Sequence, residues 1–252
     1  MIMILDTANS IRYILICVAV LGMSVQTEAQ NRPYFRDVTE THVPTAPQLH
    51  ILDEAAADVD GDGDLDLALA NENSPNRLYL NDGSGKFTDH TEKLELKVEM
   101  PSRQAHVADF TGDKLPDILF FNLTSNAQEW NQDPQIRLLV QNGEGRFWDE
   151  SAERLPFNTF SAYAGTPMDI NRDGAMDIIV GPVIIPGFHP LQYRAYLNGG
   201  NGKFRDETED YIPEKSRGRG WDMTVADFNG DGYDDLFVGG WGTQARLLQA
   251  DK

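Results

Sequence analysis

Short apolar segments alternate with acidic, glycine-rich loops along most of the chain, and the alternation recurs four times. Four nine-residue segments align with one another: DVDGDGDLD from Asp58, DFTGDKLPD from Asp109, DINRDGAMD from Asp169 and DFNGDGYDD from Asp227. Each is preceded by a short apolar stretch and followed by a β-rich run such as LALAN or ILFFN. The simplest interpretation of each segment is a strand, a loop and a second strand.

A second hairpin follows each of the first three loops. Its sequences are RLYLNDGSGKFTD, RLLVQNGEGRFWD and RAYLNGGNGKFRD, with a glycine-rich turn between the two arms. Each unit therefore contains four strands. Such a unit is typical of a propeller blade, because one four-stranded sheet cannot bury both faces until neighbours stack on it. We predict an all-β fold, a β-propeller of four four-stranded blades.

The two ends of the repeat array complement each other. The fourth unit ends at ARLLQADK, one strand short, whereas RPYFRDVTE near the N-terminus matches the strands that end the other units. We expect the strand near Phe35 to pair with the strand near Leu247 and close the ring, which would cover two sheet edges. The alternative is an open or truncated arc of a larger propeller, which would begin and end at the same points.

Oxygen-bearing side chains recur at positions 1, 3, 5 and 9 of each loop. Together with a backbone carbonyl at position 7 they form the hard oxygen cage that Ca²⁺ prefers, so we predict up to four bound Ca²⁺ ions. The predicted side-chain ligands are Asp58, Asp60, Asp62, Asp66, Asp109, Thr111, Asp113, Asp117, Asp169, Asn171, Asp173, Asp177, Asp227, Asn229, Asp231 and Asp235. The predicted carbonyl ligands are Asp64, Leu115, Ala175 and Tyr233.

Turns alone also gather Asp, Asn and Gly, so one such loop would not indicate a metal. Four loops in register, each placing several carboxylates close together, would repel themselves without a cation. Position 6 favours a residue with positive φ, which Gly63, Gly174 and Gly232 adopt readily and Lys114 does not. At position 12, where an EF-hand needs a bidentate glutamate, every loop has an apolar residue, which excludes that motif.

These loops and their flanking strands resemble the FG-GAP or VCBS repeats that build the propeller of integrin α chains and of many bacterial secreted proteins. The resemblance covers roughly residues 34 to 250. It implies a calcium-binding propeller but no single activity, because such repeats occur in adhesion, in ligand binding and alongside enzymes. The chain has fewer repeats than integrin-type propellers usually have. Thr111 and Lys114 depart from the pattern, so we expect the second loop to bind calcium most weakly and the first most tightly.

Composition and the N-terminus indicate where the protein works. Residues 1–29 look like a secretory signal peptide, with an apolar run from Tyr13 to Val25, which leaves a propeller domain over residues 30–252 and no membrane span after cleavage. The net charge of −19 opposes binding to nucleic acid. The one cysteine, Cys17, lies in the apolar run, so the secreted chain would rely on metal rather than disulfides for rigidity.

Long loops between the second and third strands of the second and third units are the predicted ligand-binding segments. They lie at the end of the blade opposite the metal loops, and Trp130, Phe188 and His189 are the candidate contacts with a partner. The alternative is that these side chains fold back onto the blade edges. The repeated phenylalanines of the outer strands are predicted to pack between blades: Phe35, Phe87, Phe147 and Phe204.

Three functions fit the sequence. The first is a secreted, calcium-braced, non-enzymatic module that binds or adheres to a protein or a carbohydrate. It is favoured because no catalytic motif is recognisable. The second is a calcium-dependent polysaccharide-active enzyme of the lyase type, for which Arg103, His106 and Arg217 are the candidate residues. The third is a non-functional fragment of a longer repeat array.

Overall fold

The computed structural model describes residues 34–46, 49–72, 75–96, 101–122, 136–158, 160–184 and 189–250. The predicted signal peptide lies outside them. The chain divides into two compact units, Met1–Asp37 and Val38–Lys252, and all of the sheets belong to the second. Within the described residues, the helices lack the length and the apolar run that crossing a bilayer needs.

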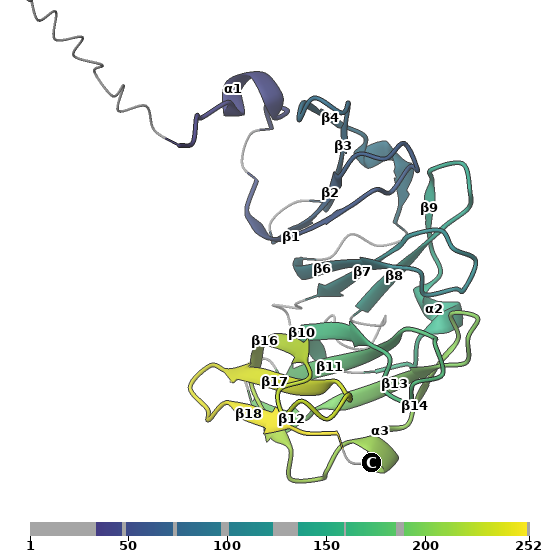
Figure 1. Ribbon diagram of the computed structural model, residues 1–252, viewed down its shortest axis with the longest axis vertical. Helices are drawn as coiled ribbons and strands as arrows, with labels where there is room; N and C mark the ends of the chain where they lie inside the picture. Colours follow the sequence, from purple (N-terminus) through teal and green to yellow (C-terminus); the bar gives the residue numbers. More distant parts are fainter. Residues whose placement is uncertain are drawn as a thin grey trace, which may run out of the picture. The chain divides into compact units, whose positions relative to one another are not determined.

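The first two blades have the predicted four antiparallel strands (Figure 1). Blade 1 contains β1 (Ile51–Ala57), β2 (Asp66–Asn71), β3 (Arg77–Asn81) and β4 (Phe87–Asp89) in sequence order. Blade 2 contains β6 (Ser102–Ala108), β7 (Asp117–Asn122), β8 (Ile136–Gln141) and β9 (Phe147–Asp149), with the short β5 (Leu94–Glu95) parallel to β9.

The third blade is larger than predicted. Its main strands are β10 (Ser161–Met168), β11 (Asp177–Ile184), β13 (Arg194–Asn198) and β14 (Phe204–Asp206). Two further short strands, β12 (His189–Gln192) and β15 (Arg217–Gly218), extend its sheet. The long loop predicted between the second and third strands of this unit is therefore partly wrong, because β11 continues to Ile184 and pairs with β12.

The fourth blade has three strands in the described residues: β16 (Gly220–Ala226), β17 (Asp235–Gly240) and β18 (Arg246–Leu248). One-turn helices follow the outer strands at matching places. These are η1 (Thr91–Lys93) after β4, α2 (Ser151–Arg154) after β9 and α3 (Thr208–Tyr211) after β14. A further helix, α1 (Thr39–His42), precedes blade 1.

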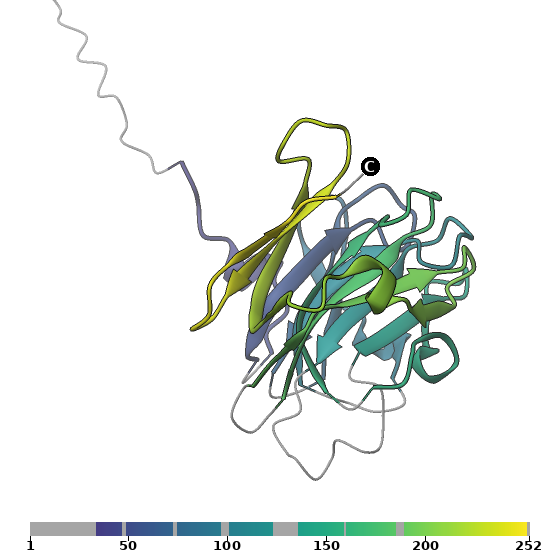
Figure 2. The ribbon, with the colours of Figure 1, turned by 90° about the horizontal axis from the view of Figure 1, so that it is seen from below.

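Three apolar cores join the blades face to face. Leu78 and Ala68 of blade 1 pack with Phe120 of blade 2, and the same pattern continues from blade 2 to 3 and from blade 3 to 4. The innermost strands β1, β6, β10 and β16 contact one another in succession. Figure 2 shows the successive sheets after a quarter turn. The four sheets are thus arranged as a four-bladed β-propeller, as predicted.

The outer-strand phenylalanines behave differently from one another. Phe147 and Phe204 are buried in the cores between blades 1 and 2 and between blades 2 and 3, as predicted. Phe87 is half-buried. Phe35 is exposed in the first unit, and residues 34–37 form no strand. Ring closure by pairing with the strand near Leu247 therefore stays a prediction.

Candidate metal centres

Each acidic loop connects the innermost strand of its blade to the next strand. The first loop runs between β1 and β2, and it lies beside the turn that joins β3 to β4. The contact is close: a Cβ atom added to Gly83 in that turn would lie 2.5 Å from Oδ2 of Asp64. Metal loops and glycine-rich turns therefore share one end of the blade, as the strand order predicts.

The aspartate at position 9 fastens each loop to the second hairpin of its blade. In blade 1, Asp66 accepts one hydrogen bond from the backbone N–H of Val59 at 3.0 Å and another from that of Asn81 at 2.8 Å. The same two bonds recur in the other three blades. All four aspartates are completely buried: Asp66, Asp117, Asp177 and Asp235. A buried carboxylate needs such partners, so this pairing fixes the loop.

The aspartates at positions 1 and 5 shape the loop itself. Asp58 accepts the N–H groups of Gly61 and Gly63 at 2.7 and 3.0 Å, and Asp62 accepts that of Asp64 at 2.9 Å. The bond from position 7 to position 5 has the same length, within 0.1 Å, in the remaining loops. The folded loop thus holds its carboxylates in place through its own backbone.

The first loop brings three carboxylates together. Oxygen atoms of Asp58, Asp60 and Asp66 lie within 4.8 Å of one another. Asp62, a fourth predicted ligand, is not part of this group. Each carboxylate oxygen that accepts one N–H retains a lone pair, so hard anionic donors converge on one point. This donor set fits a hard divalent cation such as Ca²⁺.

The other three loops differ at position 3. In the second loop the Thr111 hydroxyl is buried and has no hydrogen-bond partner among the described residues. In the third and fourth loops, the side-chain amides of Asn171 and Asn229 donate to Asp173 and Asp231 at 2.9 and 3.3 Å. An orphaned hydroxyl at a predicted ligand position fits a bound cation, because a buried oxygen without a partner is costly.

Burial dominates the electrostatics of position 9. It raises the pKa of Asp117 to about 6, despite the backbone N–H groups that lower it, and it also raises the pKa values of Asp66 and Asp177. A raised pKa means that the folded state loses stability as the pH rises from 3.8, the ordinary value of the carboxyl, and that the full cost of the charged carboxylate is reached above about 6. A cation bound in the loop would offset that cost, because it favours the charged form.

Two positions in every loop have positive φ, where the sequence indicated one. Position 6 includes Lys114 with φ 72°, so this lysine adopts the conformation that was expected only of glycine. Position 4 also has positive φ, and there Arg172, with φ 60°, occupies the place that glycine takes in the other loops. A residue with a Cβ atom is strained in this region. Glycine aligns at position 4 in three of the loops, and this was the sequence signal for the second position with positive φ.

Side-chain amides join the first and second metal loops to the next blade. Gln141 donates to the carbonyl oxygen of Val59 at 2.9 Å, and Asn198 donates to that of Phe110 at 2.7 Å. The acceptors are the position 2 residues of the preceding loop. Sequence reasoning missed this link, although an amide residue at the end of the third strand in three units was visible.

The other candidate residues are scattered. Trp130 and Phe188 lie outside the described residues, and His189 begins β12 rather than lying in a loop. Arg103 and His106 lie on β6, where Nε2 of the partly buried His106 is 3.1 Å from the carbonyl oxygen of Gly165. Arg217, on β15, donates to the carbonyl oxygen of Glu214 and forms an ion pair with the carboxylate of the same residue. Within the described residues, no contact joins Arg217 to Arg103 or His106.

Comparison with known proteins agrees with the loop geometry. The model of the FG-GAP-like repeat matches residues 58–120 and 187–238, which include the first, second and fourth acidic loops. The chain carries FG-GAP-like repeats. Over 191 residues it is 28% identical to cartilage acidic protein 1 of Xenopus tropicalis, a match that covers 72% of this chain and 27% of that protein. The chain thus spans about a quarter of that relative's length.

Two solved structures overlap with part of this chain. One is a lectin of Agrocybe aegerita that recognises non-reducing terminal N-acetylglucosamine, with 18% identity, a TM-score of 0.38, and coverage of 73% of this chain and 45% of the lectin chain. The other is BBS1N in complex with ARL6DN, with 12% identity, a TM-score of 0.43, and coverage of 76% and 52%. These partial overlaps say nothing of what this chain binds.

Strain at position 6 of the second loop predicts a stabilising substitution. Lys114→Gly should raise the free energy of unfolding in calcium-free buffer by roughly 0.5–1 kcal/mol, because glycine relieves the positive φ. Glu144→Gly is the matched control, since Glu144 is an exposed turn residue without positive φ. Urea denaturation measures both. A Lys114→Gly variant less stable than the wild type would contradict the assigned strain.

Proposed function

We propose that this FG-GAP-like chain is a secreted, non-enzymatic binding module whose blades are braced by calcium. The observation that carries the proposal is the four-fold repetition of one loop geometry, with three carboxylates converging in the first loop. The match to the FG-GAP-like repeat supports the same conclusion. The ions would be held by the position 1, 3, 5 and 9 side chains and the position 7 carbonyls predicted from the sequence.

Calcium would act on the scaffold rather than on a substrate. The cation neutralises carboxylates that the fold forces together, and it ties the loop to the hairpin through the position 9 aspartate. In a chain with a net charge of −19, several bound Ca²⁺ ions would also remove much of the self-repulsion. The partner, a protein or a carbohydrate, would then contact the blades away from the metal loops.

Calcium should raise the melting temperature of the purified protein. At a concentration about 100 times the dissociation constant, one site contributes about 2.7 kcal/mol, or about 5–10 °C for a domain of this size. The shift should be larger at pH 7 than at pH 5, because protons compete for the buried Asp117, whose pKa is raised. Differential scanning calorimetry measures both values.

Two variants make the calcium experiment specific to the loops. Asp62→Ala should reduce the calcium-dependent shift more than Asp113→Ala, because the second loop, with Thr111 and Lys114, should bind calcium most weakly. Magnesium at the same concentration is the control ion, since it demands stricter geometry. A melting temperature that is the same with and without calcium would sink the proposal.

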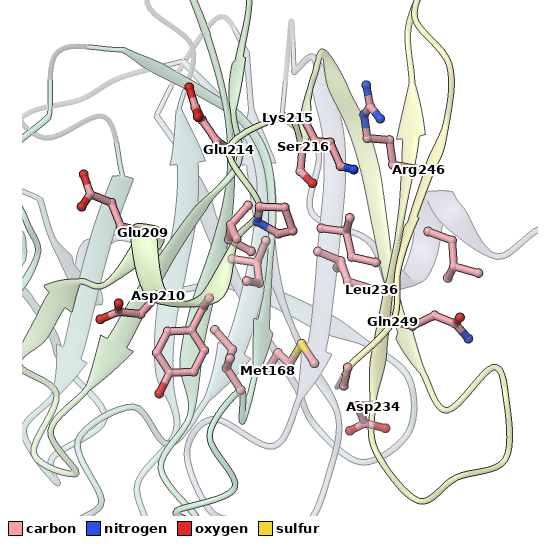
Figure 3. Close-up of a pocket in the computed structure, with 18 of the residues that line it drawn as sticks. Met168, Glu209, Asp210, Glu214, Lys215, Ser216, Asp234, Leu236, Arg246 and Gln249 are labelled. Atoms are coloured by element: carbon pink, nitrogen blue, oxygen red, sulfur yellow. The ribbon is translucent and has the colours of Figure 1, made fainter. Parts of the chain in front are cut away.

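We further propose that the N-terminal segment completes blade 4. Within the described chain β18 pairs only with β17, and an open groove of about 900 Å³ lies beside it (Figure 3). Ile170 and Leu236 line the groove, and Arg246 stands at its side. In blades 2 and 3 the equivalent place, outside the third strand, is occupied by a Phe-x-Asp strand.

The repeat gives the register of the proposed pairing. Asp89 lies opposite Tyr79 in blade 1, which places Asp37 opposite Leu248 and Phe35 opposite Ala250. An arginine of the third strand forms an ion pair with this aspartate in each of the first three blades. Arg246 and Asp37 would form the fourth such pair. Helix α1 begins two residues after Asp37, as η1, α2 and α3 do after their own aspartates.

If Phe35 fills the groove, Phe35→Ala should lower the melting temperature by several degrees, since burying and then deleting a phenylalanine costs about 3–5 kcal/mol. Phe157→Ala is the matched control, because Phe157 is exposed in blade 2's connection to blade 3. Thermal melts at equal calcium concentration compare the two. Equal melting temperatures for both variants would contradict the proposed pairing of the N-terminal segment with β18.

A further inference from the structure

One residue bulges out of the innermost strand of every blade, at the same place. The pairing between the first and second strands shifts register between Ile51 and Asp53, Ser102 and Gln104, Ala162 and Ala164, and Gly220 and Asp222. The four skipped residues are Leu52, Arg103, Tyr163 and Trp221. A β-bulge redirects a side chain and often marks a functional site. These bulges lie near the start of the innermost strands, at the end of the blades opposite the metal loops.

Three of the bulged side chains meet. The guanidinium carbon of Arg103 lies 4.4 Å from the ring centroid of Tyr163 and 3.9 Å from that of Trp221. The ring centroids of Tyr163 and Trp221 are 5.1 Å apart, and that of Trp241, which directly follows β17, is 5.2 Å from that of Trp221. We call Arg103, Tyr163, Trp221 and Trp241 the axial aromatic cluster.

The cluster presents aromatic surface to solvent. Trp221 is 39% exposed and Trp241 is 47% exposed, whereas Tyr163 is buried beneath them. Exposed tryptophans of this kind stack on apolar faces of ligands and are enriched at recognition sites. The strands that carry them, β10 and β16, are packed side by side.

A layer of hydrogen bonds holds the innermost strands below the cluster. Gln104 donates to Asp222 on β16 at 3.1 Å and accepts the N–H of Gly165 on β10 at 2.8 Å. Asp53 on β1 accepts the N–H of Ala105 at 3.1 Å. The side chains above this layer are therefore preorganised, which lowers the entropic cost of binding a ligand.

Two arginines lie at this end together with the carboxylates of Asp53, Glu72 and Asp222. The net charge is −19, yet within the described residues neither Arg103 nor Arg219 forms an ion pair, and the Nε atoms of both are buried without a hydrogen-bond partner. Arg219 is near the cluster, because a Cβ atom on Gly242 would lie 3.6 Å from its Nη1. The nearby Asp222 carboxylate already bonds to Gln104. Guanidinium groups without a carboxylate partner favour an anionic ligand.

We propose that the axial aromatic cluster binds an acidic saccharide. A pyranose ring would stack on Trp221 and Trp241, and its carboxylate or sulfate group would bond to Arg103 and Arg219. This assignment rests on the proposed function as a binding module and gives that module a ligand class. It also places the ligand on the propeller axis rather than on the long loops.

Binding of defined oligosaccharides to the full, calcium-loaded chain tests the assignment. The probes are a galacturonic acid tetrasaccharide, a chondroitin sulfate tetrasaccharide and neutral galactotetraose, and calorimetry with tryptophan fluorescence measures affinity. At least one acidic probe should bind about 10-fold more tightly than the neutral one, which is what a charge-assisted hydrogen bond contributes. The carboxylated and sulfated arms show which anionic group is preferred.

Variants locate the binding. Trp241→Ala should weaken binding of the acidic probe by about 10-fold, because the sugar loses a ring on which it stacks. Arg103→Gln should remove the preference for acid over neutral sugar. Trp148→Ala is the matched control, because Trp148 is 46% exposed but lies on the outer strand β9. This variant should bind the probes with wild-type affinity. Melting temperatures confirm that each variant is folded.

The results separate the two proposals. Equal binding of acidic and neutral probes, no binding of either, or wild-type affinity in Trp241→Ala would overturn the saccharide assignment. So would a cluster that binds only a protein. If calcium still raises the melting temperature in those cases, the calcium-braced module stands without this ligand. If the protein binds the saccharide through the cluster but calcium does not change its melting temperature, the saccharide site stands and the proposal of calcium-braced blades fails.

Discussion

The fold of this propeller depends on four buried aspartates, one in each blade, that join the acidic loop to the rest of its sheet. Each uses both carboxylate oxygens, one for the backbone of its acidic loop and one for the third strand of its blade. A charged group completely inside a β-sheet is tolerated only with such partners, so loop and hairpin must form together. From this clamp follow the position of the glycine turns and the convergence of carboxylates that a cation would neutralise.

The two ends of the blades differ in how closely the repeat is kept. At the loop end the geometry repeats closely, and the amides of Gln141 and Asn198 fasten one blade to the next. At the other end the bulged positions of the innermost strands carry a different residue in every blade, from Leu52 to Trp221. Repetition at one end and variation at the other suits a scaffold that stiffens through calcium and recognises through its axis.

Sequence predicted the elements whose residues recur. The acidic loops and glycine turns were visible because aspartate and glycine are irreplaceable there, and the four strands followed from them. The bulges were not, because one skipped residue leaves the alternation of apolar side chains intact on each side of Arg103 or Tyr163. Arg172 hid the second positive-φ position, because arginine carries no signal for it. The extra strand β12 was missed because it contains Pro190, and proline lacks the backbone N–H that a sheet needs.

Hydrogen exchange of the backbone amides of the third strands tests the clamp most directly. The N–H groups of Asn81, Gln141 and Asn198 should exchange slowly in the calcium-loaded protein, and each should lose protection when the aspartate it bonds to is replaced, as in Asp117→Asn for Gln141. The other two amides should stay protected in that variant. Exchange of Gln141 at the same rate in the wild type and in Asp117→Asn would contradict the account.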